Sequence, residues 1–151
     1  DDAAHSVGDT GRKDSIKVWG FWNILGEEAF GRPSEEDIRP WYWAWSLMCR
    51  YFHKGCDINA VELTGSGELR ACAAESDGRH TVAVVNWSSE DVQISMQAPY
   101  TFLNASVYVY EESGAYRDAE GSLVPSLTGI CGDAVSVNVP AQSLTVITDM
   151  Q

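Results

Sequence analysis

Basic residues are scarce in this sequence. Its 151 residues include 10 Lys and Arg against 22 Asp and Glu, a formal net charge of −12 with neutral histidines. Nucleic-acid phosphates are bound by clustered Lys and Arg, so this composition excludes a nucleic-acid binder that works through a basic face. Anionic membrane surfaces are equally unfavourable. The shortage is uneven: residues 1–57 carry 7 basic and 10 acidic residues, and residues 58–151 carry 3 and 12.

Long apolar runs are also missing, although 44% of the residues are hydrophobic. No segment reaches the roughly 18 to 20 residues that a membrane span requires, and the first residues lack the basic and apolar regions of a signal peptide. The sequence therefore predicts a soluble folded chain and no membrane partner. Its compartment, cytoplasmic or secreted, stays open.

The common catalytic motifs are absent. The sequence contains no G-x-S-x-G, H-E-x-x-H, G-x-G-x-x-G or P-loop pattern. Only three histidines occur, His5, His53 and His80, and they fall in unrelated segments. A histidine-based triad or a metal site is therefore not expected, no catalytic residue is assigned, and no cofactor is predicted.

Four cysteines occur without the C-x-x-C spacing of zinc or redox sites. Buried free thiols are the favoured interpretation. One disulfide, involving Cys56 and Cys131, is the alternative.

The first third of the chain is rich in aromatic residues. Residues 1–15 are polar and predict a loop, whereas Ser15–Ile24 predicts a strand with bulky side chains on both faces, as in parallel sheets and barrels. Asp37, or alternatively Ser34, suits the start of a long helix over Ile38–Lys54. Its apolar arc is wide enough to require partners on two sides.

From residue 58 the sequence alternates in short segments separated by turn signals such as Asp77-Gly78 and Gly132-Asp133. About seven or eight short strands without helical periodicity predict a mainly β fold, an antiparallel, Greek-key-like β-sandwich over residues 58–151. Residues 1–57 supply the preceding strand and helix. Strands are expected at Val61–Leu63, Leu69–Ala74, His80–Trp87, Val92–Met96, Ala105–Tyr110, Ala134–Val139 and Ser143–Thr148.

Trp22 is the candidate ligand contact. It ends the predicted first strand and is followed by Asn23 and a long loop, which is where a barrel strand presents side chains to a ligand. Substrate contact and plain packing are equally compatible with this position. Glu27 and Glu28 could form a glycosidase carboxylate pair, but adjacent loop residues rarely aim at one atom, so solvated charges are favoured.

The order of these elements resembles the C-terminal end of clan A glycoside hydrolases, in which a (β/α)8 barrel is followed by a small β-sandwich. The resemblance lies in Gly20-Phe-Trp-Asn23, in Arg50-Tyr-Phe-His-Lys-Gly55, in Val82-Ala-Val-Val-Asn-Trp-Ser88 and in Val139-Pro-Ala-Gln-Ser-Leu-Thr-Val-Ile-Thr148. It implies that Ile16–Ile24 corresponds to barrel strand eight, Ile38–Lys54 to helix eight and Asn59–Gln151 to the sandwich.

Little function follows from this resemblance. The family's two catalytic glutamates end strands four and seven, which this sequence does not contain, and only Trp22 and Asn23 match a substrate-binding position. A complete barrel needs about 250 residues. The resemblance therefore implies a non-catalytic accessory region, a remnant of the barrel (1–57) with a sandwich that stabilises the missing catalytic barrel.

Two other hypotheses remain: a self-standing carbohydrate-binding module that holds glycans on exposed tryptophans, and a structural domain of a surface protein. Without a barrel, the apolar helix also predicts self-association through Trp41, Trp43 and Trp45.

Overall fold

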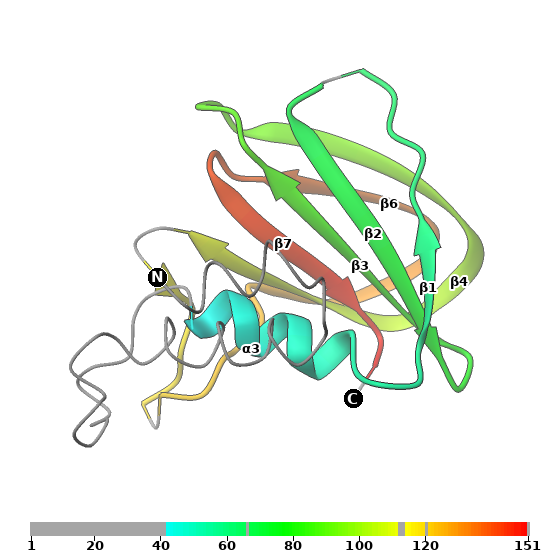
Figure 1. Ribbon diagram of the computed structural model, residues 1–151. Helices are drawn as coiled ribbons and strands as arrows, with labels where there is room; N and C mark the ends of the chain where they lie inside the picture. The colour runs from blue at the N-terminus through cyan, green and yellow to red at the C-terminus, as the bar shows by residue number, and fades with distance from the viewer. Residues whose placement is uncertain (1–41, 66, 112–113, 120, 151) are drawn as a thin grey trace, which may run out of the picture. The chain divides into compact units, whose positions relative to one another are not determined.

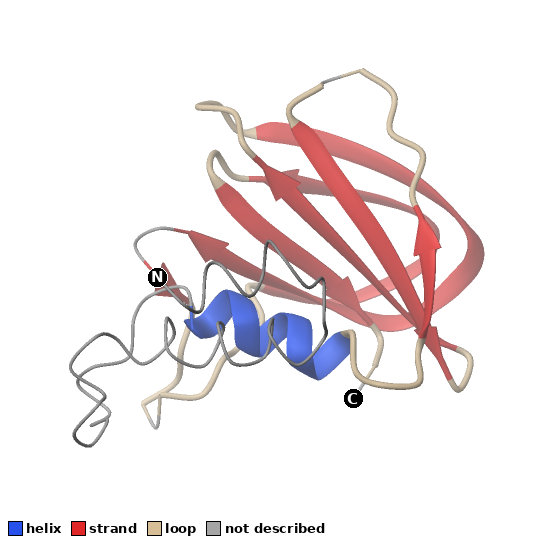
Figure 2. Cartoon of the chain, in the orientation of Figure 1, coloured by secondary structure: helices blue, strands red, loops and turns tan. Residues whose placement is uncertain are grey.

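The computed structural model describes residues 42–150 except 66, 112–113 and 120. The described part is mainly β, with one helix and antiparallel strands (Figure 2), as the sequence predicts. The predicted strand Ser15–Ile24 and the predicted start of the helix at Ile38 lie outside the described residues. The elements are α3 (Tyr42–Tyr51), β1 (Asp57–Ala60), β2 (Leu69–Ser76), β3 (Arg79–Asn86), β4 (Val92–Glu111), β5 (Gly114–Ala115), β6 (Leu127–Val139) and β7 (Ser143–Thr148).

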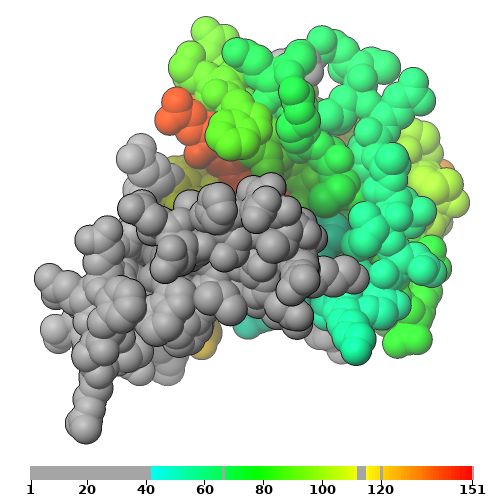
Figure 3. All heavy atoms as spheres, viewed as in Figure 1, coloured from blue at the N-terminus to red at the C-terminus, as the bar shows by residue number. Residues whose placement is uncertain are grey.

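The strands form one antiparallel sheet in the order β1-β2-β3-β7-β4-β5, and β6 pairs with β4. The last strand therefore returns to lie between β3 and β4, as a Greek-key-like order requires and a simple meander does not. Strands β1, β2 and β3 are paired side by side. In the space-filling view, atoms in the cyan-green and green of this part of the chain cover the upper and right-hand part of the visible face (Figure 3).

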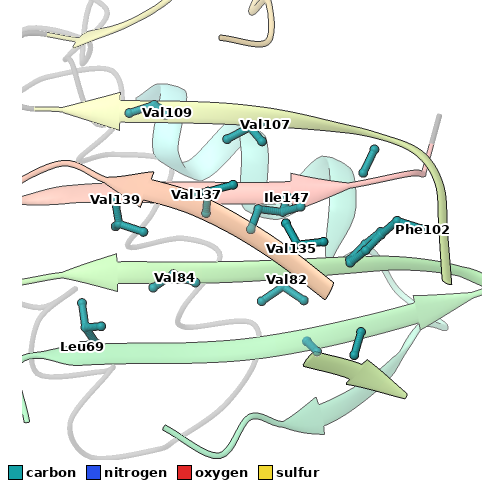
Figure 4. Close-up of a cluster of buried hydrophobic side chains, with 13 residues drawn as sticks. Leu69, Val82, Val84, Phe102, Val107, Val109, Val135, Val137, Val139 and Ile147 are labelled. Atoms are coloured by element: carbon teal, nitrogen blue, oxygen red, sulfur yellow. The ribbon is translucent and has the colours of Figure 1, made fainter. Parts of the chain in front are cut away.

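The long strand β4 gives the sheet two layers. It curves, so that its first half and its partner β6 lie behind β2, β3 and β7 (Figure 1). Side chains from both layers converge on one core (Figure 4). Phe102, Val139 and Ile147 are fully buried in it. This is the predicted sandwich, built by folding one sheet over on itself.

Helix α3 covers the outer face of the same sheet. Leu47 and Tyr51 of the helix pack with Ala83 of β3 and with Leu144 and Val146 of β7. Strand β7 is consequently buried along its whole length, since alternate residues face the sandwich core and the helix. The helix belongs to one compact unit with the sandwich, Trp43–Gln151. The predicted division after residue 57 concerns mostly residues that the structure does not describe, and it stays a prediction.

The predicted turn at Asp77-Gly78 is confirmed. Both residues have positive φ, 52° and 70°, which is typical of a tight two-residue hairpin turn. It joins β2 to β3, whose residues pair without interruption from Ser76 and Arg79 to Leu69 and Asn86.

The prediction of two separate strands, Val92–Met96 and Ala105–Tyr110, was wrong because β4 runs continuously through both. Pro99 is tolerated inside β4 because the pairing with β6 shifts between Gln97 and Phe102, where the missing N–H costs no ladder bond. Gly132 has φ 114° within β6, opposite Phe102, so the predicted turn at Gly132-Asp133 is a β-bulge.

Two further boundaries needed correction. The first strand of the sandwich is Asp57–Ala60 and not Val61–Leu63; Val61 instead packs against the core from the loop that follows β1. The helix ends at Tyr51 and not at Lys54. Gly55 has φ 100°, a left-handed conformation that glycine adopts without strain, and it lies in a separate turn after the helix.

Candidate functional site

The sequence-based ligand contacts, Trp22 and Asn23, lie outside the described residues, as does Trp41. Of the helix tryptophans, Trp43 packs against the cluster that joins α3 to the sheet, and the guanidinium of Arg117 lies 5.1 Å from its ring centroid. Trp45 is half-buried. The proposed self-association through these tryptophans therefore stays a prediction, with Trp43 already engaged within the chain.

The interface between α3 and the sheet is the first candidate site. Its centre is a tyrosine pair, Tyr51 of α3 and Tyr108 of β4, whose ring centroids lie 5.5 Å apart at an interplanar angle of 39°. Burial raises the pKa of Tyr51 to about 12, and a hydrogen bond with Tyr108 adds to this shift. Tyr51 therefore keeps its neutral hydroxyl at a pH where an ordinary tyrosine ionises, and it anchors the helix through packing and hydrogen bonding.

An open groove of about 570 Å³ at the edge of the sandwich is the second candidate site. It lies between the segment that follows β1 and the first half of β4, and its size is within the range of small-molecule pockets. Its floor is apolar, with Ala73, Val82 and Ala98, and its polar groups include Asn59, Glu62, Glu75, Ser95 and Gln97.

Two aromatic side chains organise one end of this groove. The imidazole of His80 stacks on the ring of Tyr100 with centroids 3.5 Å apart and an interplanar angle of 6°, and Tyr100 meets Phe102 edge-on at 5.2 Å. Nε2 of His80 lies 3.9 Å from a carboxylate oxygen of Glu75. Burial, followed by the carboxylates of Asp149 and Glu75, raises the pKa of Tyr100.

Asp149 joins three segments beside this end of the groove. One carboxylate oxygen accepts the backbone N–H of His80 at 2.7 Å, and the other accepts the backbone N–H of Leu103 at 3.2 Å. The Asp149 residue is 5% exposed. Sequence reasoning missed this link and the stacked rings because His80 and Tyr100 come from different strands. The available signal in the sequence was Asp149 itself, a single acidic residue directly after the apolar strand β7.

No metal centre is found in the part of the chain that the structure describes, where no three His, Cys, Asp or Glu side chains gather. All four cysteines are free thiols, which agrees with the favoured interpretation and not with a disulfide between Cys56 and Cys131. They are less buried than expected, because Cys49 and Cys131 are exposed. Within the described ranges, no helix is long and apolar enough to cross a membrane.

No protein-family model and no curated protein matches this sequence. Solved structures do match. A GH30 endoxylanase from Clostridium papyrosolvens has a TM-score of 0.60 and 13% identity over 74% of this chain and 28% of that chain. A conserved exported protein from Bacteroides fragilis has a TM-score of 0.53 and 14% identity over 70% and 21%. The catalytic domain of a GH30 xylanase C from Talaromyces cellulolyticus has a TM-score of 0.50 and 16% identity over 72% and 24%.

These comparisons define a class of fold. The chain spans between about a fifth and somewhat over a quarter of the length of these three structures. At this level of identity the likeness concerns the fold alone. The described residues thus have the fold of a part of larger proteins, two of which are GH30 xylanases.

Proposed function

We propose that this chain is the C-terminal accessory region of a glycoside hydrolase-like protein, non-catalytic by itself, which stabilises a catalytic barrel. The observation that carries the proposal is the packing of helix α3 on the outer face of the sandwich through Leu47 and Tyr51. A helix held in this way can join a barrel and a sandwich as one rigid connection.

The comparisons support this proposal through coverage. The similar structures are several times longer than the matched part, and two of the three are xylanases by their own descriptions. In this proposal the missing partner is the catalytic barrel, to which residues 1–57 contribute the last strand and helix. Trp22 and Asn23 would then lie at the substrate end of that strand, as barrel strands place their ligand contacts.

The parent protein tests this proposal. The reading frame before Asp1 is expected to encode repeated strand and helix segments, with two glutamates at strand ends. The parent protein is expected to release reducing ends from xylan, and the 151-residue chain is expected to release none. Hydrolysis by the purified 151-residue chain, or a parent without the repeated segments, would overturn the proposal. The second outcome would favour the structural domain of a surface protein.

A self-standing carbohydrate-binding module is the second candidate, and Trp87 favours it. This side chain is 70% exposed in the loop that follows β3, and exposed indole rings can stack on sugar faces. Tryptophan fluorescence titrated with xylo- and cello-oligosaccharides separates the two candidates. The accessory proposal predicts no change at millimolar sugar, whereas a binding module predicts saturable quenching that Trp87→Ala abolishes and Tyr116→Ala, at another exposed aromatic position, leaves unchanged.

A further inference from the structure

A second pocket, of about 470 Å³, lies where the end of helix α3 meets the sheet and the C-terminal segment. It shares no lining residue with the open groove at the edge of the sandwich that is described above. Two arginines line it, Arg50 from the last turn of α3 and Arg79 from the start of β3. The described residues contain only five Lys and Arg in all, so two of the five gather around one hollow in a strongly acidic chain.

The two arginines are not neutralised inside the described part of the chain. Arg79 is half-buried, and its guanidinium forms no ion pair or hydrogen bond with any described residue. The guanidinium of Arg50 lies 5.9 Å from the ring centroid of Tyr51, whose hydroxyl it hydrogen-bonds, and it has no ion pair with a described residue. A half-buried guanidinium without a partner is unusual, because its desolvation is not repaid by a counter-charge.

One wall of the pocket is a row of neutral polar groups. Asn104, Ser106 and Tyr108 line it from β4, and their two-residue spacing puts them on one face of that strand. The residues between them, Ala105 and Val107, face the sandwich core. This row offers an amide and two hydroxyl groups, which can hydrogen-bond a hydroxylated molecule.

The charge of the pocket selects the ligand. Asp149 also lines it, and its carboxylate oxygens accept two backbone N–H groups, while no ion pair between it and either arginine is found among the described residues. Among the described residues that line the pocket, two guanidinium groups and one carboxylate give a formal charge of +1. The carbonyls at the helix end add some negative potential. A monoanion is therefore better matched than a phosphate dianion, and a guanidinium fits a carboxylate in a bidentate fork.

We propose that this pocket binds a small hydroxylated monocarboxylate. Arg79 and Arg50 bind its carboxylate, and the polar side chains of β4 that line the pocket hydrogen-bond its hydroxyl groups. This proposal is independent of the proposed accessory function, because every residue assigned to the ligand belongs to the described part of the chain.

Isothermal titration calorimetry of the 151-residue chain tests this proposal, with sodium gluconate as the probe. Sorbitol, which lacks the carboxylate, and inorganic phosphate are the comparison ligands. We expect saturable millimolar binding of gluconate that weakens as salt is raised, weaker binding of phosphate, and none of sorbitol. Equal binding of sorbitol, tighter binding of phosphate, or no saturable binding of gluconate would overturn the assignment.

The variant Arg79→Gln is expected to weaken gluconate binding about tenfold or more, because it removes the charged hydrogen-bond donors. Arg70→Gln is the matched control: Arg70 is on the neighbouring strand β2, its guanidinium donates to the backbone oxygens of Gly67 and Leu69, and it does not line the pocket. If both variants weaken gluconate binding equally, the effect comes from the overall charge of the protein, and the assignment of Arg79 to the ligand is wrong. If Arg79→Gln fails to fold, Arg50→Gln, at an exposed helix position, decides the question by the same criterion.

Discussion

Replacement of Leu47 by alanine tests the contact on which the proposed function depends. Leu47 is fully buried at the centre of the face that α3 presents to β3 and β7. If the helix is an integral part of the folded unit, this substitution must destabilise the whole unit, because it opens a cavity between helix and sheet. If the helix only rests against the sandwich, the strands must keep their stability.

The expected magnitude follows from the buried side chain. Leucine to alanine removes about three carbon groups, each worth about 0.8 kcal/mol when buried. A cavity term adds to this transfer term, so we expect a loss of about 3 kcal/mol in the free energy of unfolding. For a domain of this size that corresponds to a fall of roughly 10 °C in Tm.

Urea unfolding, followed by circular dichroism at the β-sheet signal, measures the effect. Cys49→Ala is the matched control, because Cys49 is two residues away in the same helix and exposed; it is expected to change stability by less than about 0.5 kcal/mol. The double variant Leu47→Ala with Val146→Ala should lose less than the sum of the single variants, since the two residues share one cluster. An unchanged sheet transition in Leu47→Ala would refute the reasoning.

Three more predictions concern single groups. Asp149→Ala should lower the free energy of unfolding by about 2 to 5 kcal/mol in the same assay, because it leaves two backbone N–H groups without their acceptors. Asp149→Asn keeps one acceptor oxygen and should lose less stability. Equal losses in the two variants would contradict this role of Asp149. The pKa of Tyr51 is raised to about 12 in the folded protein, so the stability that Tyr51 contributes is complete below pH 10 and is lost as the pH rises towards 12; an absorbance titration at 295 nm should show one tyrosine fewer in Tyr51→Phe only above pH 11. All four thiols should react with Ellman's reagent in urea, and a denatured count of two would restore the disulfide alternative. In the native protein the exposed Cys131 should react before the half-buried Cys72, because burial raises the pKa of Cys72, as it also does for Cys49.

Periodicity predicted the central strands well. The ends of strands β2, β3 and β7 were predicted to within two residues of their observed positions. These strands have a neighbouring strand on each side, and their apolar side chains must face a core, so their sequences show clear patterns. The turn Asp77-Gly78 was equally predictable, since both of its residues tolerate positive φ. In these segments local preference and tertiary packing agree.

The long strand β4 shows where sequence reasoning failed. Residues 97–104 contain Pro99 and lack strict alternation, so they do not look like the middle of a strand. The structure keeps them extended because a curved strand that changes layers needs irregular pairing at the bend, which the shifts near Gln97 and Phe102 provide. Proline and the bulge at Gly132 are thus part of the curvature, and a single sequence offers no sign that two apparent interruptions on distant strands face each other.

The candidate sites were less predictable than the fold for a related reason. Each depends on neighbours far apart in sequence: Arg50 and Arg79 come from a helix and a strand, and His80 meets Tyr100 across two strands. The apolar side chains on the outer face of β7 explain why helix α3 packs against the sheet. Leu144 and Val146 point away from the sandwich core and pack against the helix, so residues 43–51 belong to the same compact unit as the strands, whereas the predicted boundary after residue 57 stays a prediction. The contacts of Leu144 and Val146 with the helix are therefore the ones that the Leu47→Ala variant tests.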